Sequence, residues 1–396
     1  MSSFDIERAR RETRACEQVA HFNSAGASLM SAPVADALHS YLDKEERCGG
    51  YETAESEVAA LDNFYTASSK LLNCHVDEIA FAENATRAWD MAFYAFDFKP
   101  GDRILTTVSE YGSNVIAYLQ QAERQGVELV FVPDDEHGQL DVTALEAALD
   151  ERTKLISISY IPTGGGLVNP AAEVGRIAQA AQVPFLLDAC QAVGQLPLDV
   201  EALGCTILSG TGRKYLRGPR GTGLLYVQRD WIERLRPPLL DQHAANLTSA
   251  STYTIRDDAK RFENWEQNFA GKAALGTAID YALAWGLEAT WERVQTLGAL
   301  LRQRLRALDR VTVVDQGQIQ CGIVTFTVEA MVAGDIKAAL RVRNINVSVS
   351  DGSGNRVSYD RRGLTATVRA SVHYFNTEDE IDCLIAALGD CLCPSK

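Results

Sequence analysis

The chain has 396 residues, 46% of them hydrophobic and 23% charged, which is ordinary for a soluble globular protein with a large core. At about 100–200 residues per domain, this length predicts two or three domains, or one large domain and one small one. The formal net charge of −15 disfavours nucleic acid and anionic membrane surfaces as partners, because a negative field attracts neither.

The start of the chain, MSSFDIERARRETRACEQ, is charged and has no apolar signal segment. No run approaches about 20 uninterrupted apolar residues, so we expect a cytoplasmic protein without a membrane span. The nine cysteines are odd in number and scattered, which does not fit a disulfide framework. Cys391 and Cys393 lie close to the C-terminus, and we expect them to be reduced thiols of a partly exposed tail rather than metal ligands. The six histidines are dispersed, so we expect no metal.

Short apolar runs alternate with amphipathic stretches between about residues 61 and 226. The expected strands are Glu78–Ala82, Arg103–Thr107, Leu129–Val132, Leu155–Tyr160, Pro184–Asp188, Thr206–Ser209 and Gly223–Tyr226. Helices between them include Thr86–Ala95, Asn114–Gln125, Val142–Leu149 and Pro170–Gln182. This alternation predicts an α/β fold with a mostly parallel seven-stranded sheet, in which ligands lie at the carboxyl ends of the strands.

The rest of the chain predicts a smaller α+β unit. A polar, irregular stretch at Pro237–Asp258 precedes a long helical run over Trp265–Leu308, with a break near Gly286. Three strands (Val311–Val314, Gly322–Val328, Ala366–Val372) and two helices (Gly334–Arg341, Thr377–Gly389) follow. We expect a large domain over residues 20–280 and a small C-terminal domain over residues 281–396, joined by the N-terminal segment 1–19.

An acidic residue, Asp188, ends the apolar strand in VPFLLDACQAVG. A carboxylate at that place is costly unless it meets a cation or a hydrogen-bond donor. A protonated pyridine nitrogen of a cofactor is one such partner. The alternative is that Asp188 only caps a helix or a turn by accepting from backbone N–H groups, and the residue taken alone favours this alternative. Gln191, three residues on, is placed to reach the same cofactor.

A second motif, TILSGTGRKYLRGPRGTGLLYV, puts Lys214 in a glycine-rich turn between two strands. The small residues let the backbone approach a ligand, and Thr211 and Arg213 offer a hydroxyl and a guanidinium suited to phosphate. Neighbouring positive charge favours the neutral, nucleophilic amine of a lysine. Alone, such a lysine indicates a basic turn on a solvated face, but the spacing from Asp188, with a strand on each side, favours a cofactor lysine.

A third motif, FAENATRAWDMAFYAF, begins a helix at Asn84, Ala85 and Thr86. A helix N-terminus binds phosphate well, although Thr86 is also compatible with a plain cap. Neither GxGxxG nor GxxxxGK[ST] occurs, which disfavours a dinucleotide fold or a P-loop.

The order ENATRA, SEYGSN, DACQAVG, SGTGRK, GPRGTG, VRASVHYFNTEDEID resembles the class V aminotransferase family. That family has the type I fold of pyridoxal 5′-phosphate (PLP) enzymes and includes cysteine desulfurases, selenocysteine lyases and isopenicillin N epimerase-like enzymes. FNSAGAS, GGYE, PTGGGLVNP and RFENWE look like its hercynylcysteine sulfoxide lyase branch. The resemblance implies PLP as cofactor, an amino-acid substrate and a homodimer with sites near the interface.

The resemblance also implies roles for single residues. Lys214 matches the Schiff-base lysine, Asp188 the acid paired with the pyridine nitrogen, and Arg369 the arginine that binds the substrate carboxylate. Tyr111 stands where relatives stack a histidine on the ring. The other implied cofactor positions are Ala85, Thr86, Thr163, Gln191, Thr211 and Arg213, and the implied substrate positions are Ser24, Ala25 and Tyr51, with Tyr51 reaching the neighbour's pocket. Glu266 replaces a threonine that reaches the partner's phosphate in relatives.

One absence separates the possible reactions. Cysteine desulfurases need a mobile cysteine in the loop before the carboxylate-binding arginine, and NVSVSDGSGNRVSYDRRGLTATVR contains none. We therefore expect a C–S β-lyase, in which Lys214 takes the Cα proton of a cysteine conjugate or its sulfoxide. Transamination and epimerisation with Tyr111 as a second base remain alternatives. A catalytically inactive binding protein is disfavoured by the intact Lys214, Asp188 and Arg369.

Overall fold

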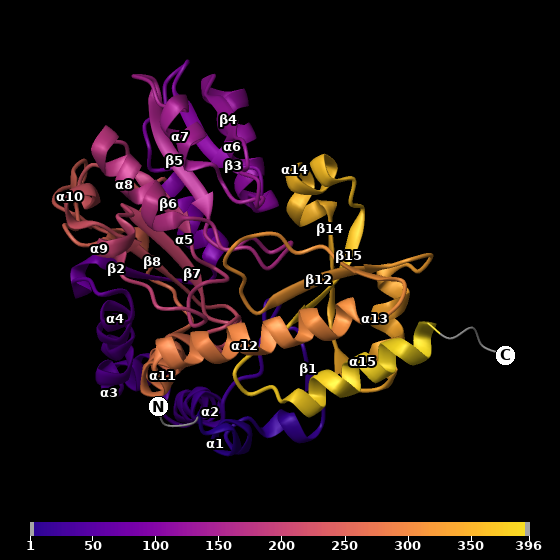
Figure 1. The fold of residues 1–396 in the computed structure, drawn as a ribbon. Helices are drawn as coiled ribbons and strands as arrows, with labels where there is room; N and C mark the ends of the chain where they lie inside the picture. Colours follow the sequence, from indigo (N-terminus) through magenta and orange to yellow (C-terminus); the bar gives the residue numbers. More distant parts are fainter. Residues whose placement is uncertain (1–3, 393–396) are drawn as a thin grey trace.

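The computed structural model describes residues 4–392, and a seven-stranded sheet lies at the centre of its larger part (Figure 1). Its strands are β2 (Ile79–Ala82), β3 (Arg103–Thr107), β4 (Glu128–Val132), β5 (Thr153–Ser159), β6 (Phe185–Asp188), β7 (Ile207–Thr211) and β8 (Gly223–Val227). Their order is β2-β8-β7-β6-β5-β3-β4, and β8 alone runs in the direction opposite to the other six strands. This confirms the predicted fold class.

The strands are largely apolar because helices cover both faces of the sheet. Leu186 of β6 packs on the side of α5 (Ala85–Phe93) and α6 (Gly112–Gln125). Leu187, the next residue, points the opposite way and packs with α4 (Val58–Leu72) and α8 (Ala171–Ala181). The sheet is therefore covered on both sides, and Asp188 lies at the carboxyl end of β6.

A second, antiparallel sheet lies beside the large one in the order β11-β12-β15-β14. Its strands are β11 (Val311–Val313), β12 (Ile323–Val328), β14 (Ser348–Asp351) and β15 (Ala366–Ser371), packed against α12 (Leu287–Arg306), α13 (Ala333–Val342) and α15 (Glu378–Leu392). The N-terminal segment joins this unit: β1 (Ala20–His21) pairs with β13 (Ile345–Asn346), and α1 (Ile6–Arg11) contributes Ala9 to the same core. The exact domain limits stay a prediction.

The helical run that connects the two sheets breaks at Gly286, as expected. Gly286 has a φ of 80° and separates α11 (Phe269–Trp285) from α12. A positive φ is accessible to glycine without strain, so the chain turns there. Helix α11 packs on α4 and on α2 (Ala32–Cys48), whereas α12 runs along the small sheet (Figure 1). The remaining helices are α3 (Gly50–Ser56), α7 (Val142–Ala148), α9 (Val200–Leu203) and α10 (Arg229–Ile232), with 3-10 turns at Arg14–Glu17, Val76–Glu78 and Ala259–Phe262.

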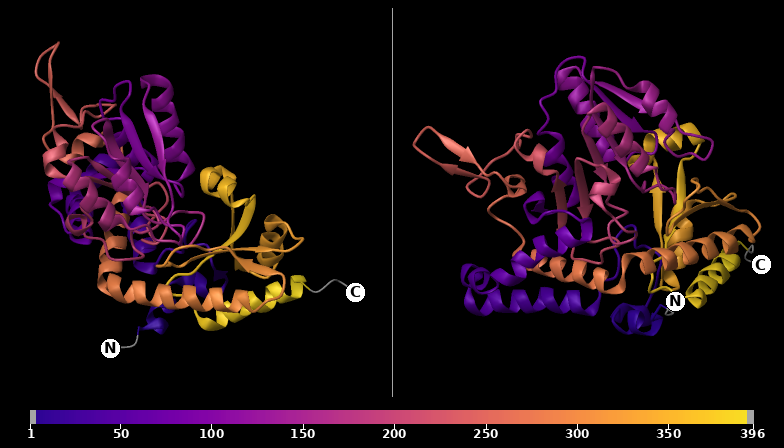
Figure 2. Two further views of the ribbon diagram at one scale, coloured as in Figure 1. Left: turned by 45° about the horizontal axis from the view of Figure 1, so that its top comes forward. Right: turned by 60° about the vertical axis from the view of Figure 1, so that its left-hand side comes forward.

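Two segments differ from the sequence expectation. The polar stretch 237–258 carries a hairpin of β9 (Ala245–Leu247) and β10 (Tyr253–Ile255), which projects from the body of the molecule (Figure 2). The segment before Arg369 is not a loop but β14 followed by α14 (Gly352–Arg362). The Asp351 side chain accepts from the backbone N–H of Ser353 at 2.9 Å and caps the first turn of α14, which is kinked at Asn355 (φ −144°, ψ 30°).

Within residues 4–392, no helix is long and apolar enough to cross a membrane. In the same range, no group of three or more histidine, cysteine or acidic side chains is arranged to hold a metal ion. Of the two C-terminal cysteines, Cys391 and Cys393, the second lies outside the described residues.

The tight packing of α8 predicts a stability difference between two helical glycines. A Cβ on Gly175 would lie 1.9 Å from the carbonyl oxygen of Leu203, whereas one on Gly389 would meet nothing within 4 Å. Gly175→Ala should lower the thermal unfolding midpoint, at a cost of about 1–3 kcal/mol. Gly389→Ala should leave the midpoint unchanged or raise it, because alanine favours a helix by about 0.5–1 kcal/mol over glycine. Equal midpoints for the two variants would contradict this packing.

Candidate active site

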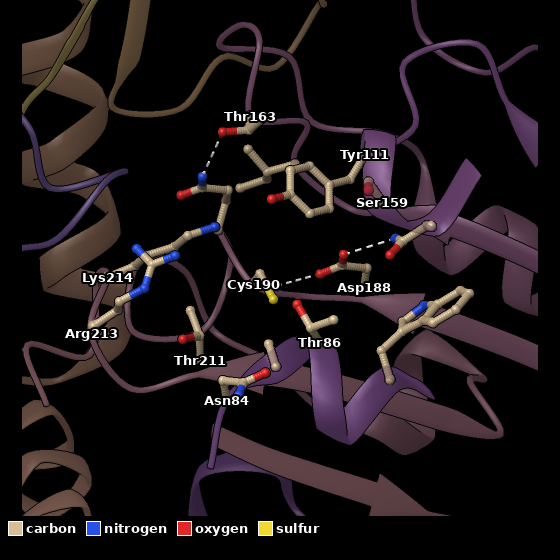
Figure 3. Close-up of a pocket in the computed structure, with 15 residues that line it drawn as sticks. Asn84, Thr86, Tyr111, Ser159, Thr163, Asp188, Cys190, Thr211, Arg213 and Lys214 are labelled. Atoms are coloured by element: carbon tan, nitrogen blue, oxygen red, sulfur yellow. Dashed lines mark hydrogen bonds between the residues drawn. The ribbon is translucent and has the colours of Figure 1, made fainter. Parts of the chain in front are cut away.

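A pocket opens at the carboxyl ends of the central strands (Figure 3). It is bordered by the first turn of α5, the start of α6, the ends of β5, β6 and β7, and the turn that follows β7. The lining residues are Asn84, Ala85, Thr86, Trp89, Tyr111, Asn114, Ser159, Ile161, Thr163, Asp188, Cys190, Gln191, Thr211, Arg213 and Lys214. All nine cofactor positions predicted from the sequence are therefore brought together.

Asp188 lies on the floor of this pocket and is 6% exposed. Its carboxylate accepts from the backbone N–H of Cys190 at 2.9 Å and from the Asn114 amide at 3.0 Å. The first bond is the turn contact that the sequence left open as an alternative. Both donors are neutral, so neither balances the charge of the carboxylate, and a cationic ring nitrogen in the pocket would do so.

Lys214 reaches the pocket from the turn after β7. Burial lowers the pKa of Lys214 to about 8. The positive charges of Arg213 and Arg369 also lower this pKa, whereas the negative charge of Asp188 raises it. A larger fraction of the amine is therefore neutral and nucleophilic near pH 8 than for an ordinary lysine.

The turn that carries Lys214 is held from outside the large sheet. The backbone N–H of Arg217 donates to the carbonyl of Lys214 at 3.0 Å. The buried Arg217 side chain donates to the Leu29 carbonyl at 2.8 Å and to the Tyr374 hydroxyl at 2.6 Å. The N-terminal segment and the small unit thus fix the turn, and Lys214 with it.

One end of the pocket suits an anion. Asn84 caps α5 by accepting from the backbone N–H of Arg87 at 2.9 Å, and the N–H groups of the first helical turn have no acceptor within the helix. The hydroxyls of Thr86 and Thr211 line the same end. This combination of a helix N-terminus and hydroxyls fits a phosphate group.

The opposite end connects the pocket to the small unit through Thr163. The Gln191 amide donates to the Thr163 hydroxyl at 3.2 Å and to the Ala25 carbonyl at 3.1 Å, while its own oxygen is buried without a partner. Arg369, on β15, donates to the same hydroxyl at 2.5 Å and to the Thr163 carbonyl at 3.1 Å. The Arg369 Nε is also buried without a partner, so this guanidinium can receive a carboxylate.

The other predicted positions differ in how they relate to the pocket. Tyr111 is 37% exposed at the start of α6 and borders the pocket, as a ring-stacking residue would. Ser24 is fully buried behind Gln191, beside Ala25. Tyr51 does not line this pocket; it is 70% exposed and lines a separate hollow with Glu266. Its expected contact with a neighbour's pocket stays a prediction.

Several residues of the site were not singled out from the sequence. Asn114, Ser159, Trp89, Ile161 and Cys190 line the pocket. Asn114 and Ser159 both bond a buried carboxylate, Glu110, just below it. Glu110 comes shortly after an apolar strand, just as Asp188 ends one. The pattern that drew attention to Asp188, an acidic residue at the carboxyl end of a strand, therefore also occurs at Glu110.

These residues together fit PLP. Arg369 bonds the pocket residue Thr163 but does not itself line the pocket, whereas Gln191 does and keeps a buried oxygen without a partner. Three features of the pocket carry the fit: a lysine of lowered pKa, a buried Asp188 whose two hydrogen-bond donors are neutral, and an anion-binding end. The aldehyde, pyridine nitrogen and phosphate of PLP correspond to these three features.

Comparison with known proteins identifies the family. The class V aminotransferase family model matches residues 20–384. A cysteine desulfurase from Dickeya dadantii is 31% identical over 79% of this chain and 76% of its own. A probable cysteine desulfurase from Methanothermobacter thermautotrophicus is 29% identical over 96% of both chains.

Solved structures share the fold. The apo cysteine desulfurase of Thermococcus onnurineus matches with a TM-score of 0.92 over 99% of both chains at 24% identity. The cystine C-S lyase C-DES, in complex with cysteine persulfide, matches with a TM-score of 0.86 at 23% identity, over 96% of this chain and 99% of its own. The chain belongs to the class V aminotransferase family and is a PLP-dependent enzyme.

The lowered pKa of Lys214 predicts how fast the apoprotein takes up PLP. Only the neutral amine attacks the aldehyde, so the uptake rate should rise with pH, reach half its maximum near pH 8 and then level off. Stopped-flow absorbance of the visible cofactor band over a pH series measures this rate. A rate that keeps rising toward the pKa of an ordinary lysine, about 10.4, would contradict the assignment.

Proposed function

We propose that the protein is a C–S β-lyase that cleaves a cysteine conjugate or its sulfoxide. The observation that carries the proposal is the state of the thiols around the pocket. The segment that closes against the pocket mouth, β14 with α14, contains no cysteine. The thiol that lines the pocket belongs to Cys190, in the turn after β6.

The position of α14 supports this reading. A Cβ on Gly112 would lie 2.5 Å from the carbonyl oxygen of Ser353, and one on Gly354 would lie 3.8 Å from the Tyr111 ring and 3.7 Å from Thr163. The start of α14 thus borders the two pocket residues from the side of the small unit. A thiol on this segment would reach the pocket, and the segment instead offers serine and glycine.

Cys190 is poorly suited to accept sulfur. Burial, and then the charge of Asp188, raise the pKa of the Cys190 thiol well above its ordinary value. The thiolate is the nucleophilic form of cysteine, and this environment suppresses it. A desulfurase reaction that leaves a persulfide on an enzyme cysteine, which the names of the relatives suggest, therefore has no suitable thiol among the pocket residues.

The residues of the pocket can divide the work of an elimination. Bound PLP supplies electron withdrawal from the substrate Cα. Arg369 would hold the substrate α-carboxylate, and Lys214 would take the proton from Cα and return protons to the departing groups. Asp188 would keep the pyridine nitrogen protonated, and Tyr111 would cover the ring. The C–S bond breaks as a thiolate leaves Cβ of a cysteine conjugate, or a sulfenate leaves Cβ of its sulfoxide, and hydrolysis by water then releases pyruvate and ammonia.

A homodimer belongs to the same proposal. Tyr51 and Trp265 are 70% and 55% exposed, and Tyr51 lies on a hollow beside Glu266. Large exposed aromatic side chains near a hollow are typical of interaction sites. The eight described cysteines are all free, which fits a cytoplasmic location.

Product analysis tests the reaction. Cysteine, cystine and S-substituted cysteine sulfoxides should each be incubated with the holoenzyme, and pyruvate, ammonia and alanine quantified. The proposal predicts equal amounts of pyruvate and ammonia without alanine. Alanine formed together with sulfane sulfur, which an added thiol reductant would release as sulfide, would contradict it in favour of desulfuration. Amino transfer to an added keto acid without pyruvate would favour an aminotransferase.

Arg369→Ala tests the carboxylate contact. KM should rise by about tenfold or more, because a charge-assisted bidentate contact is lost, while the bound PLP per chain stays unchanged. Arg304→Ala is the matched control, since Arg304 forms an exposed ion pair with Asp382 on the outside of α12. Loss of PLP from the Arg369 variant, or an unchanged KM, would reject this role.

A further inference from the structure

Glu110 is a buried carboxylate that lies below the pocket and does not line it. It follows β3 at the start of α6 and is 2% exposed. One oxygen accepts from the Tyr111 backbone at 2.7 Å, the Asn114 amide at 3.0 Å and the Ser159 hydroxyl at 2.5 Å. The other accepts from the Thr106 hydroxyl at 3.1 Å and the Ser159 backbone at 3.0 Å. Three elements thus meet on one side chain.

The Asn114 amide links this carboxylate to Asp188. The same Asn114 nitrogen donates to Glu110 and to Asp188, each at 3.0 Å. Ser159 and Asp188 are also register partners on the adjacent strands β5 and β6. The orientation of the Asp188 carboxylate is therefore set by an amide that Glu110 holds in place.

Glu110 also fixes the start of α6. Its bond to the Tyr111 backbone N–H fills one of the donors that a helix N-terminus leaves open. Tyr111 borders the pocket on this turn, so the place of its ring depends on the same carboxylate.

We propose that Glu110 is a positioning residue of the PLP site: it aligns Asp188 through Asn114 and places Tyr111 through its backbone. This inference rests on the proposed placement of PLP in the pocket, and adds a residue that touches neither cofactor nor substrate. Its role requires a carboxylate, because all five partners donate. An amide would turn an NH₂ group toward one of those donors and break the arrangement.

The ionisable groups around Glu110 matter for the design of a test. Asp188 faces it from β6 and Tyr118 from α6. Burial, together with the charge of Asp188 and against the hydrogen bond from Ser159, raises the pKa of Glu110 to about 7. Measurements at about pH 8.5 therefore compare a carboxylate with a neutral amide.

The test compares Glu110→Gln with Glu123→Gln, an exposed change on the same helix. Each apoprotein is titrated with PLP, and the circular dichroism of the bound cofactor band is recorded, because this signal reports how the chain orients the ring. Glu110→Gln should bind PLP about tenfold more weakly, since bonds to a charged group are lost, and should give less dichroism per bound cofactor. Glu123→Gln should match the wild type in both.

A second variant keeps the test decisive if Glu110→Gln does not fold. Asn114→Leu removes the link to Asp188 and leaves the other donors to Glu110, and it should also reduce affinity and dichroism. If either variant folds and has the PLP affinity and dichroism of the wild type, the inference about Glu110 is overturned, but the proposed function is not. A wild-type chain that takes up no PLP would instead contradict the proposed function, and with it this inference.

Discussion

The site depends on a pair of opposite charges that share one buried pocket without touching. Asp188 has two neutral donors, and Lys214 has its pKa lowered to about 8 by burial. In a medium of low dielectric such groups are costly unless a ligand completes them. A ligand with an aldehyde at one end and a basic ring nitrogen at the other satisfies both, which explains why the strand ends can retain these side chains.

The two sheets contribute different parts of this arrangement. The large sheet carries the acid, the lysine turn and the anion-binding helix start, while the small sheet carries Arg369. Thr163 connects them, since it bonds both Gln191 and Arg369. Arg217 makes a second connection, from the lysine turn to Tyr374. A change in how the two units pack would therefore displace Arg369 and Lys214 together.

Much of this was predictable from local patterns. The parallel strands were visible because both of their faces are buried, which makes each a largely apolar run, and the break at Gly286 was visible as a glycine in a long helical pattern. Asp188 and Lys214 stood out as charged residues at strand ends. The residues missed were those whose role arises only when strands align: Ser159 meets Glu110 because β5 lies beside β3. Helix α14 was missed because its polar sequence has no apolar stripe and its cap is a single aspartate.

The relatives named as cysteine desulfurases share the fold and the family, but a shared fold does not fix the reaction. What separates the reactions is which nucleophile or base can reach the substrate. In this chain, Lys214 is suited to proton transfer, whereas burial suppresses the thiolate of Cys190.

The placement of the cofactor on Lys214 can be tested by mapping the covalent adduct. The holoprotein is reduced with borohydride and digested, and the modified peptide is identified by mass spectrometry. The structure predicts a reduced pyridoxyl phosphate group on Lys214. An adduct on Lys272, a buried lysine that bonds Tyr65 at 2.6 Å and Gln267 at 3.0 Å, or an unmodified Lys214, would contradict the assignment.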